Sequence, residues 1–136
     1  GLFQYAGVRG RKAMILISDG EDTASTYGYD EVKDFAMRAG VTIYTIGIDL
    51  PTGKVRTRHQ LRRLSEITGG RAFFIAEGSE LNRIYEEIDR ELRTQYLLAY
   101  TSSSTKPSDE LREIEVEVDR KGLEVRTISG YFPGGF

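Results

Sequence analysis

A strand–helix–strand pattern near the start of the chain most constrains its fold. Residues 13–17 (Ala-Met-Ile-Leu-Ile) form an apolar run without polar alternation, which is typical of a strand buried on both faces of a parallel sheet. Four apolar residues then follow the spacing of one helix face: Val32, Phe35, Ala36 and Ala39. We expect Asp30 to cap this helix and Gly40 to end it. The β-branched run at 41–48 predicts a second strand, so the three elements make a βαβ unit.

Two further helices and one further strand extend this pattern. The second helix is expected to end in a glycine pair, and its inward residues are Leu61, Leu64 and Ile67. Residues 72–76 predict a third buried strand, and Ser79 is placed to cap a third helix. The apolar stripe of that helix is Leu81, Ile84, Tyr85, Ile88 and Leu92. The alternation predicts an α/β layered sheet over residues 1–95.

The pattern changes beyond residue 95. Residues 96–100 predict a strand, while residues 114–119 and 123–128 alternate apolar and polar side chains, as strands with one wet face do. A Lys-Gly pair between the last two segments predicts a tight turn. We therefore expect residues 96–136 to form an antiparallel β extension of three strands.

Composition excludes several functional classes. The 136 residues carry 19 Lys and Arg against 21 Asp and Glu, a net charge of −2, and this balance gives no support for nucleic-acid binding. No apolar run approaches the roughly 20 residues that cross a bilayer, so we expect no membrane insertion by this segment. With no Cys and a single His, thiolate catalysis and multi-His metal sites are excluded. The first residues have neither Met nor a signal-peptide pattern, and we interpret them as a cut end.

The loop after the first strand is the candidate functional site. Asp19 stands at the end of a strand predicted to be buried, where a carboxylate needs a partner or a cation to offset its desolvation. Ligands of open α/β sheets collect at the carboxyl ends of strands, and Mg²⁺ prefers oxygen ligands. In the alternative interpretation Asp19 only caps the loop, with Glu21 and Asp22 solvated. Spacing alone leaves both interpretations open.

A basic cluster is the second feature of the chain. No acid occurs from residue 54 to residue 63, and the basic residues there are Lys54, Arg56, Arg58, Arg62 and Arg63. The cluster is compatible with a solvated helix face or with binding of an anionic ligand. The solvated face is the simpler interpretation.

Several motifs, in order along the chain, carry a family resemblance. Residues 15–20 (Ile-Leu-Ile-Ser-Asp-Gly) and 41–48 resemble the fourth and fifth strands of a von Willebrand factor type A (VWA) domain. Residues 68–74 resemble its sixth strand with the preceding turn. Residues 81–100 are similar to the bacterial branch described as VWFA-related, which is well represented in Acidobacteria. The resemblance implies the C-terminal half of a doubly wound, Rossmann-like parallel sheet, followed by the antiparallel extension.

The resemblance also implies a protein-binding, adhesion-type module and not an enzyme. The metal-ion-dependent adhesion site (MIDAS) of that family uses an Asp-x-Ser-x-Ser motif, a Thr from a middle loop and an Asp after the fourth strand, which Asp19 matches. The other two motifs would precede this chain, so we expect an incomplete site here. Mg²⁺ or a similar divalent cation would bind in the full domain, with Ser18, Glu21 and Asp22 at the rim of the site. The resemblance further implies an extracytoplasmic protein, secreted or in the cell envelope.

An enzyme is the alternative function. A Mg²⁺-dependent phosphotransfer enzyme of α/β type also places an Asp at a strand end. Such enzymes commonly need a second carboxylate two residues on, here Glu21, and a hydroxyl or Lys elsewhere. The residues that directly follow the later predicted strands offer only acids, Asp49 and Glu77.

Overall fold

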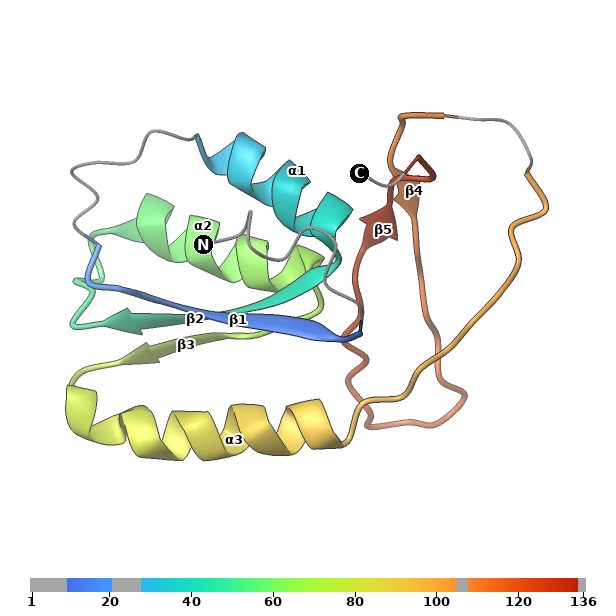
Figure 1. Ribbon diagram of the computed structural model, residues 1–136. Coiled ribbons are helices and arrows are strands. Elements are labelled where there is room, and N and C mark those ends of the chain that lie inside the picture. The colour runs from blue at the N-terminus through green and yellow to red at the C-terminus, as the bar shows by residue number, and fades with distance from the viewer. Residues whose placement is uncertain (1–9, 21–27, 105–107, 135–136) are drawn as a thin grey trace.

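The computed structural model confirms the predicted alternation of strands and helices (Figure 1). It describes residues 10–20, 28–104 and 108–134. The elements are β1 (Lys12–Ser18), α1 (Tyr29–Ala39), β2 (Val41–Ile48), α2 (Val55–Ile67), β3 (Ala72–Ile75), the 3₁₀ turn η2 (Gly78–Glu80), α3 (Leu81–Arg93), β4 (Arg112–Glu113) and β5 (Gly130–Tyr131). The chain is thus an α/β structure with a small antiparallel pair.

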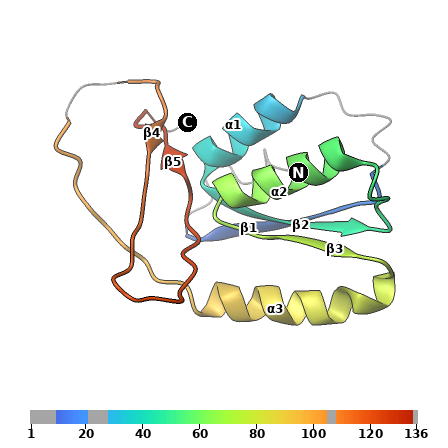
Figure 2. The same cartoon turned by 180° about the vertical axis from the view of Figure 1, so that it is seen from behind.

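Strand β2 is the centre of a parallel three-stranded sheet with the order β1-β2-β3. β1 pairs with β2 along its whole length, from Lys12 opposite Val41 to Ser18 opposite Gly47. Helices α1 and α2 cover one face of the sheet, and α3 runs along the other (Figures 1 and 2). Because β2 is covered on both faces, its sequence shows a continuous run of apolar and β-branched residues without alternation.

Two clusters of buried side chains hold the layers together. The cluster under α1 and α2 contains Ala36, Ala39, Val41, Ile43 and Leu64. The cluster under α3 contains Tyr44, Ile46, Phe73, Ile75, Ile84 and Ile88. Full burial of one large apolar side chain contributes roughly 1.5–3 kcal/mol. Strand β2 supplies residues to both clusters, so it links the two halves of the core.

Polar contacts fix the position of α2 on the sheet. Thr45 is fully buried, and its hydroxyl donates to the Leu61 carbonyl at 3.1 Å and lies 2.9 Å from the Ser65 hydroxyl. Just after α2, Gly70 crosses β2 so closely that a Cβ there would collide with the Ile43 carbonyl oxygen. Glycine is therefore required at this crossing.

Both predicted side-chain helix caps are wrong. Gly28 is the N-cap of α1, and its N–H donates to the Glu31 carboxylate at 2.8 Å, whereas Asp30 lies inside the first turn. Ser79 lies within η2, and its hydroxyl donates to Glu77 at 3.3 Å. In α1, Glu31 at the third helical position reaches back to the backbone N–H of the N-cap residue, which is the Glu half of a capping box.

The antiparallel extension is smaller than predicted. Among the described residues of the tail, β4 pairs with β5, and an antiparallel bridge joins Thr68 and Ile128. Residues 96–100 pair with no strand among the described residues, and Tyr96 and Leu97 are 94% and 87% exposed. The prediction of three antiparallel strands is therefore wrong, because strand-like sequence forms a strand only where a partner satisfies its backbone.

The tail is nevertheless attached to the α/β layers. The Ser129 N–H donates to the carbonyl of Ile67, the last residue of α2, at 2.9 Å. The Arg126 guanidinium lies 2.7 Å from the Glu91 carboxylate of α3. Burial, with a further contribution from Glu91, raises the pKa of Tyr44 to about 12. Glu91 therefore joins the tail, α3 and the core at one point.

One edge of the sheet leaves apolar side chains uncovered. Ile15 and Ile17 of β1 lie opposite Tyr44 and Ile46, on the face that carries α3. They are 40% and 45% exposed, whereas their partners on β2 are buried. An edge strand of this kind offers backbone groups and apolar surface to another strand.

We predict that the isolated 136-residue chain self-associates through β1. Ile17→Lys should shift it toward monomer, because a charge on an edge strand opposes strand pairing. Val55→Lys is the matched control, since Val55 is 67% exposed on a helix and belongs to no strand. Light scattering after size exclusion measures the mass of each variant. A monodisperse wild-type monomer would contradict the prediction.

Candidate functional site

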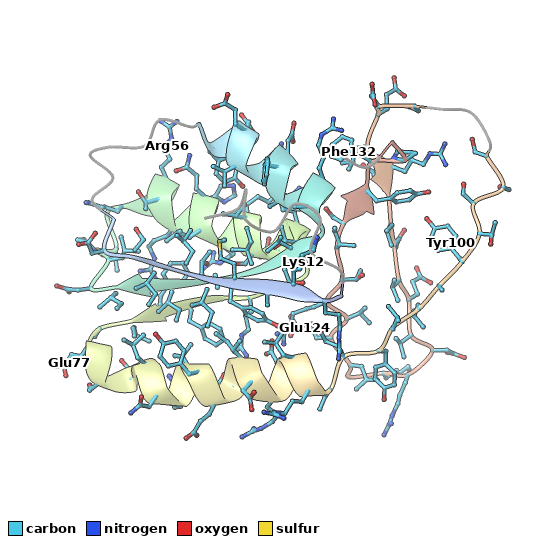
Figure 3. The ribbon with its side chains drawn as sticks, viewed as in Figure 1. Lys12, Arg56, Glu77, Tyr100, Glu124 and Phe132 are labelled. Atoms are coloured by element: carbon cyan, nitrogen blue, oxygen red, sulfur yellow. The ribbon has the colours of Figure 1, made fainter. Side chains whose placement is uncertain are left out.

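The candidate site lies at the carboxyl edge of the sheet. The strands β2 and β3 point toward this edge, and Glu77, just beyond β3, lies on it (Figure 3). The loop after β1 contains Asp19 and Gly20, and the loop after β2 runs from Asp49 to Lys54. Loops from three parallel strands therefore meet on one side of the molecule, as the sequence predicts.

Asp19 is exposed at this edge. The expected cost of burying its carboxylate does not arise, because Asp19 is exposed at the end of a strand that lies at the edge of the described sheet. Next to it, the Ser18 hydroxyl accepts a hydrogen bond from the Gly20 N–H at 3.1 Å. Gly20 has a φ of +83°, a left-handed conformation that favours glycine. The backbone geometry of Gly20 and the hydrogen bond to the Ser18 hydroxyl therefore contribute to the shape of the turn.

The loop after β2 holds the Asp19 turn in place. The Lys54 ammonium donates to the Gly20 carbonyl at 3.0 Å. Leu50 is buried against Gly20 and Gly47, and a Cβ on either glycine would collide with its side chain. Arg58 donates to the Leu50 carbonyl at 3.1 Å. We call this set of contacts (Gly20, Gly47, Leu50, Lys54 and Arg58) the loop clasp.

The third loop is also connected to the second. Asp49 has a positive φ of 50°, and its N–H donates to the Ile75 carbonyl at the end of β3 at 2.9 Å. Sequence reasoning missed the loop clasp. The sequence indicates Lys54 only as part of a basic cluster, and it gives no sign that Leu50 belongs to the site.

The described residues do not form a metal site on their own. Asp19 and Ser18 supply oxygen atoms, but no group of three or more His, Asp or Glu side chains within residues 10–20, 28–104 and 108–134 could hold a metal ion. The predicted rim residues Glu21 and Asp22 lie outside the described residues.

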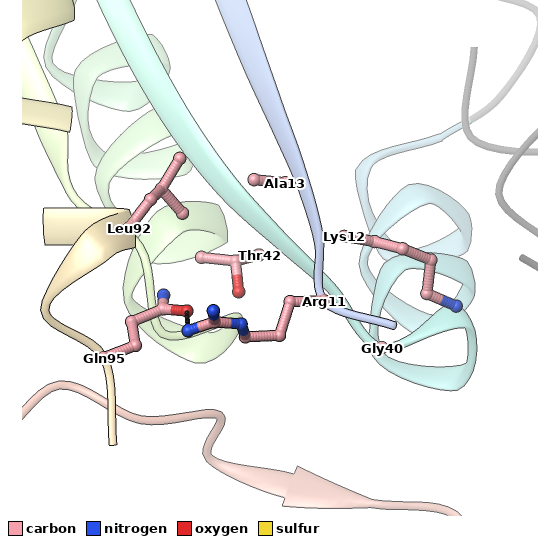
Figure 4. Close-up of a pocket in the computed structure, with 7 residues that line it drawn as sticks. All are labelled: Arg11, Lys12, Ala13, Gly40, Thr42, Leu92 and Gln95. Atoms are coloured by element: carbon pink, nitrogen blue, oxygen red, sulfur yellow. Dashed lines mark hydrogen bonds between the residues drawn. The ribbon is translucent and has the colours of Figure 1, made fainter. Parts of the chain in front are cut away.

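Two cavities of the described structure lie away from Asp19. One, of about 290 Å³, opens at the opposite, amino edge of the sheet, where Arg11 donates to Gln95 at 3.5 Å (Figure 4). Another, of about 520 Å³, lies between the end of α2, the start of β3 and the tail, and it is lined by Arg62, Ala72 and Val125 among others. Neither cavity contains residues 18–20.

Comparison with known proteins shows the family of the chain. The sequence model of the von Willebrand factor type A domain matches residues 4–87. The chain therefore belongs to the VWA family, in agreement with the resemblance of its motifs. No curated protein matches the chain, and within the described residues no helix has the length and apolar character to cross a membrane.

A solved structure supports the same fold. The chain is similar to an uncharacterized membrane-spanning protein from Vibrio fischeri, with 26% identity and a TM-score of 0.51. The match covers 65% of this chain and 50% of that protein. The chain thus spans half the length of this relative.

We predict that Lys54→Met loosens the Asp19 turn. Loss of the hydrogen bond to the Gly20 carbonyl should lower the free energy of unfolding by about 0.5–1.5 kcal/mol and speed amide exchange in residues 18–20. Lys33→Met is the control, because Lys33 makes only surface ion pairs, with Asp30 and Asp34. Such pairs contribute about 0–1 kcal/mol. Hydrogen exchange followed by mass spectrometry measures the difference, and equal exchange at residues 18–20 in both variants would contradict the loop clasp.

Proposed function

We propose that this chain is part of a protein-binding, adhesion-type module that recognises its partner at the carboxyl edge of the sheet. VWA domains are usually binding modules without catalytic activity, and many bind a divalent cation through a MIDAS. The observation that carries the proposal is the place of Asp19. It is exposed at the end of β1 in a VWA sheet, on a turn that the loop clasp holds. The exposure of this carboxylate at the strand end supports recognition of a cation or of a partner at this edge.

A divalent cation, Mg²⁺ or a similar ion, is the cofactor in this proposal. Asp19 supplies one ligand, and Ser18 lies at the rim together with Glu21 and Asp22. Because Mg²⁺ demands near-octahedral oxygen ligands, one loop cannot complete the site. The Asp-x-Ser-x-Ser motif that supplies further ligands in the family does not occur in these 136 residues, so in this proposal the chain alone binds the ion weakly.

The proposed division of the chain follows its attachment points. Residues 1–95 form the C-terminal part of the VWA domain, since α3 ends at Arg93 and the next residues leave the α/β layers. Residues 96–136 form an antiparallel extension that rejoins the layers near Ile67 and Glu91. We also propose an extracytoplasmic location, which rests on the family resemblance alone.

One observation favours the alternative of a Mg²⁺-dependent phosphotransfer enzyme. A Lys does reach the strand-end edge, because Lys54 lies 3.0 Å from the Gly20 carbonyl. Such a group could neutralise a phosphate beside Asp19. Hydrolysis of a generic phosphate ester, assayed with and without Mg²⁺, separates the two functions. Activity that requires both Mg²⁺ and Lys54 would replace the binding module with the enzyme.

We predict that Asp19→Ala, made in the longer parent protein, abolishes metal binding and leaves the fold intact. The side chain is exposed, so its removal opens no cavity in the core. Calorimetric titration with Mg²⁺ and Mn²⁺ measures the binding, and circular dichroism checks the fold. Asp119→Ala is the matched control, because Asp119 is an exposed carboxylate of the tail. Metal binding that survives Asp19→Ala would contradict the assignment of the site.

A further inference from the structure

The exposed face of α2 carries a strip of three arginines and one histidine. Arg56, His59, Arg62 and Arg63 fall at positions i, i+3, i+6 and i+7, so they share one side of the helix. All four residues are exposed. The other two basic residues of the cluster are half-buried and belong to the loop clasp, as Lys54 and Arg58 contact backbone carbonyls. The cluster that the sequence shows as one group is therefore divided into a structural pair and a surface strip.

No side chain of the surface strip forms an ion pair with another described residue. The nearest acids are Glu66, one helical turn beyond the arginines, and Glu115 and Glu124 of the tail, which line the same cavity as Arg62. None of the ion pairs within the described parts of the chain involves a side chain of α2. Helix α3 behaves in the opposite way, since Arg83 pairs with Glu80 and Glu87 and Arg93 pairs with Asp89. The segment from residue 50 to residue 65 contains no acid at all. Positive charge is thus concentrated on one helix of a protein whose net charge is −2.

The strip begins near the candidate site. Arg56 lies toward the carboxyl edge of the sheet, at the start of α2 (Figure 3). Further along, the Arg62 guanidinium lies 5.6 Å from the centre of the Phe74 ring, which Arg58 also contacts at 4.1 Å. An aromatic ring beneath a guanidinium orients it while its N–H groups stay available. A partner bound at the carboxyl edge would therefore meet this strip.

We propose that the surface strip of Arg56, Arg62 and Arg63 binds an acidic segment of a protein partner. This inference rests on one part of the proposed function, namely that the partner is a protein. It does not require a bound metal ion. Each guanidinium can hold a carboxylate through two parallel hydrogen bonds. From Arg56 to Arg63 the helix rises about 10 Å, a length that about three residues of an extended acidic segment would span.

The charges on the rest of the molecule favour a short acidic segment over a long polyanion. Nucleic acids are bound along extended basic tracks, whereas the strip covers two turns of one helix. The tail carries an exposed acidic run, Glu113, Glu115, Glu117 and Asp119, which would repel a long chain of phosphates. A protein segment with a few clustered carboxylates avoids that repulsion.

Two triple variants with the same change in net charge test the proposal. Arg56→Gln/Arg62→Gln/Arg63→Gln removes three charges from α2, and Arg83→Gln/Arg90→Gln/Arg93→Gln removes three from α3. The probe is a fluorescent peptide of ten glutamates, and its anisotropy is followed in EDTA. The wild-type protein should bind it, the α2 variant should lose at least about tenfold in affinity (about 1.4 kcal/mol), and the α3 variant should stay within about twofold. Circular dichroism verifies that both variants are folded.

Three results would overturn the proposal: no binding by the wild-type protein, equal losses in the two variants, or tighter binding of single-stranded DNA than of the peptide through the same arginines. Repeating the titration with Asp19→Ala separates this inference from the proposed function. Peptide binding in EDTA should survive that substitution, because the strip acts without a metal. If the parent protein then shows no binding of Mg²⁺, the proposed metal site fails while the basic strip remains.

Discussion

Burial of β2 on both faces is the constraint on which the rest of the structure depends. Its side chains enter the cluster under α1 and α2 as well as the cluster under α3, so β1 and β3 must lie beside it. The register of β1 on β2 then sets Ser18 opposite Gly47. A shift by one residue would turn every side chain of β1 to the other face. The position of Asp19 at the sheet edge therefore follows from packing in the core.

The loop clasp connects the buried strand β2 to the Asp19 turn of the candidate site. Gly47 lies within β2 and Gly20 within the Asp19 turn, and the buried side chain of Leu50 rests on both. Lys54 completes the contact through the Gly20 carbonyl. The shape of the turn thus depends on two glycines and one apolar side chain, and a binding surface built on it is preorganised before any partner arrives.

Patterns among neighbouring residues predicted the strands, the helices and the end of α1. The apolar runs of the strands, the helical spacing and Gly40, which ends α1 in a left-handed turn with a φ of 60°, are all readable from neighbouring residues. The loop clasp was not predictable in this way, because Lys54 and Gly20 are separated by 34 residues and their contact leaves no local signal. The wrong prediction of a strand at residues 96–100 has the same cause. The β propensity of these residues is a local property, whereas the partner strand that pairing requires is not visible in the local sequence.

Paramagnetic broadening by Mn²⁺ tests most directly the central claim that the carboxyl edge is the metal-binding surface of this domain. In ¹H–¹⁵N spectra of the parent protein, the account predicts that substoichiometric Mn²⁺ broadens the amide signals of Asp19 and Gly20 first, with Leu50 next. Asp19→Ala should abolish that effect. Broadening that begins instead at the acidic run of the tail, or that spreads evenly over the exposed carboxylates, would contradict the account.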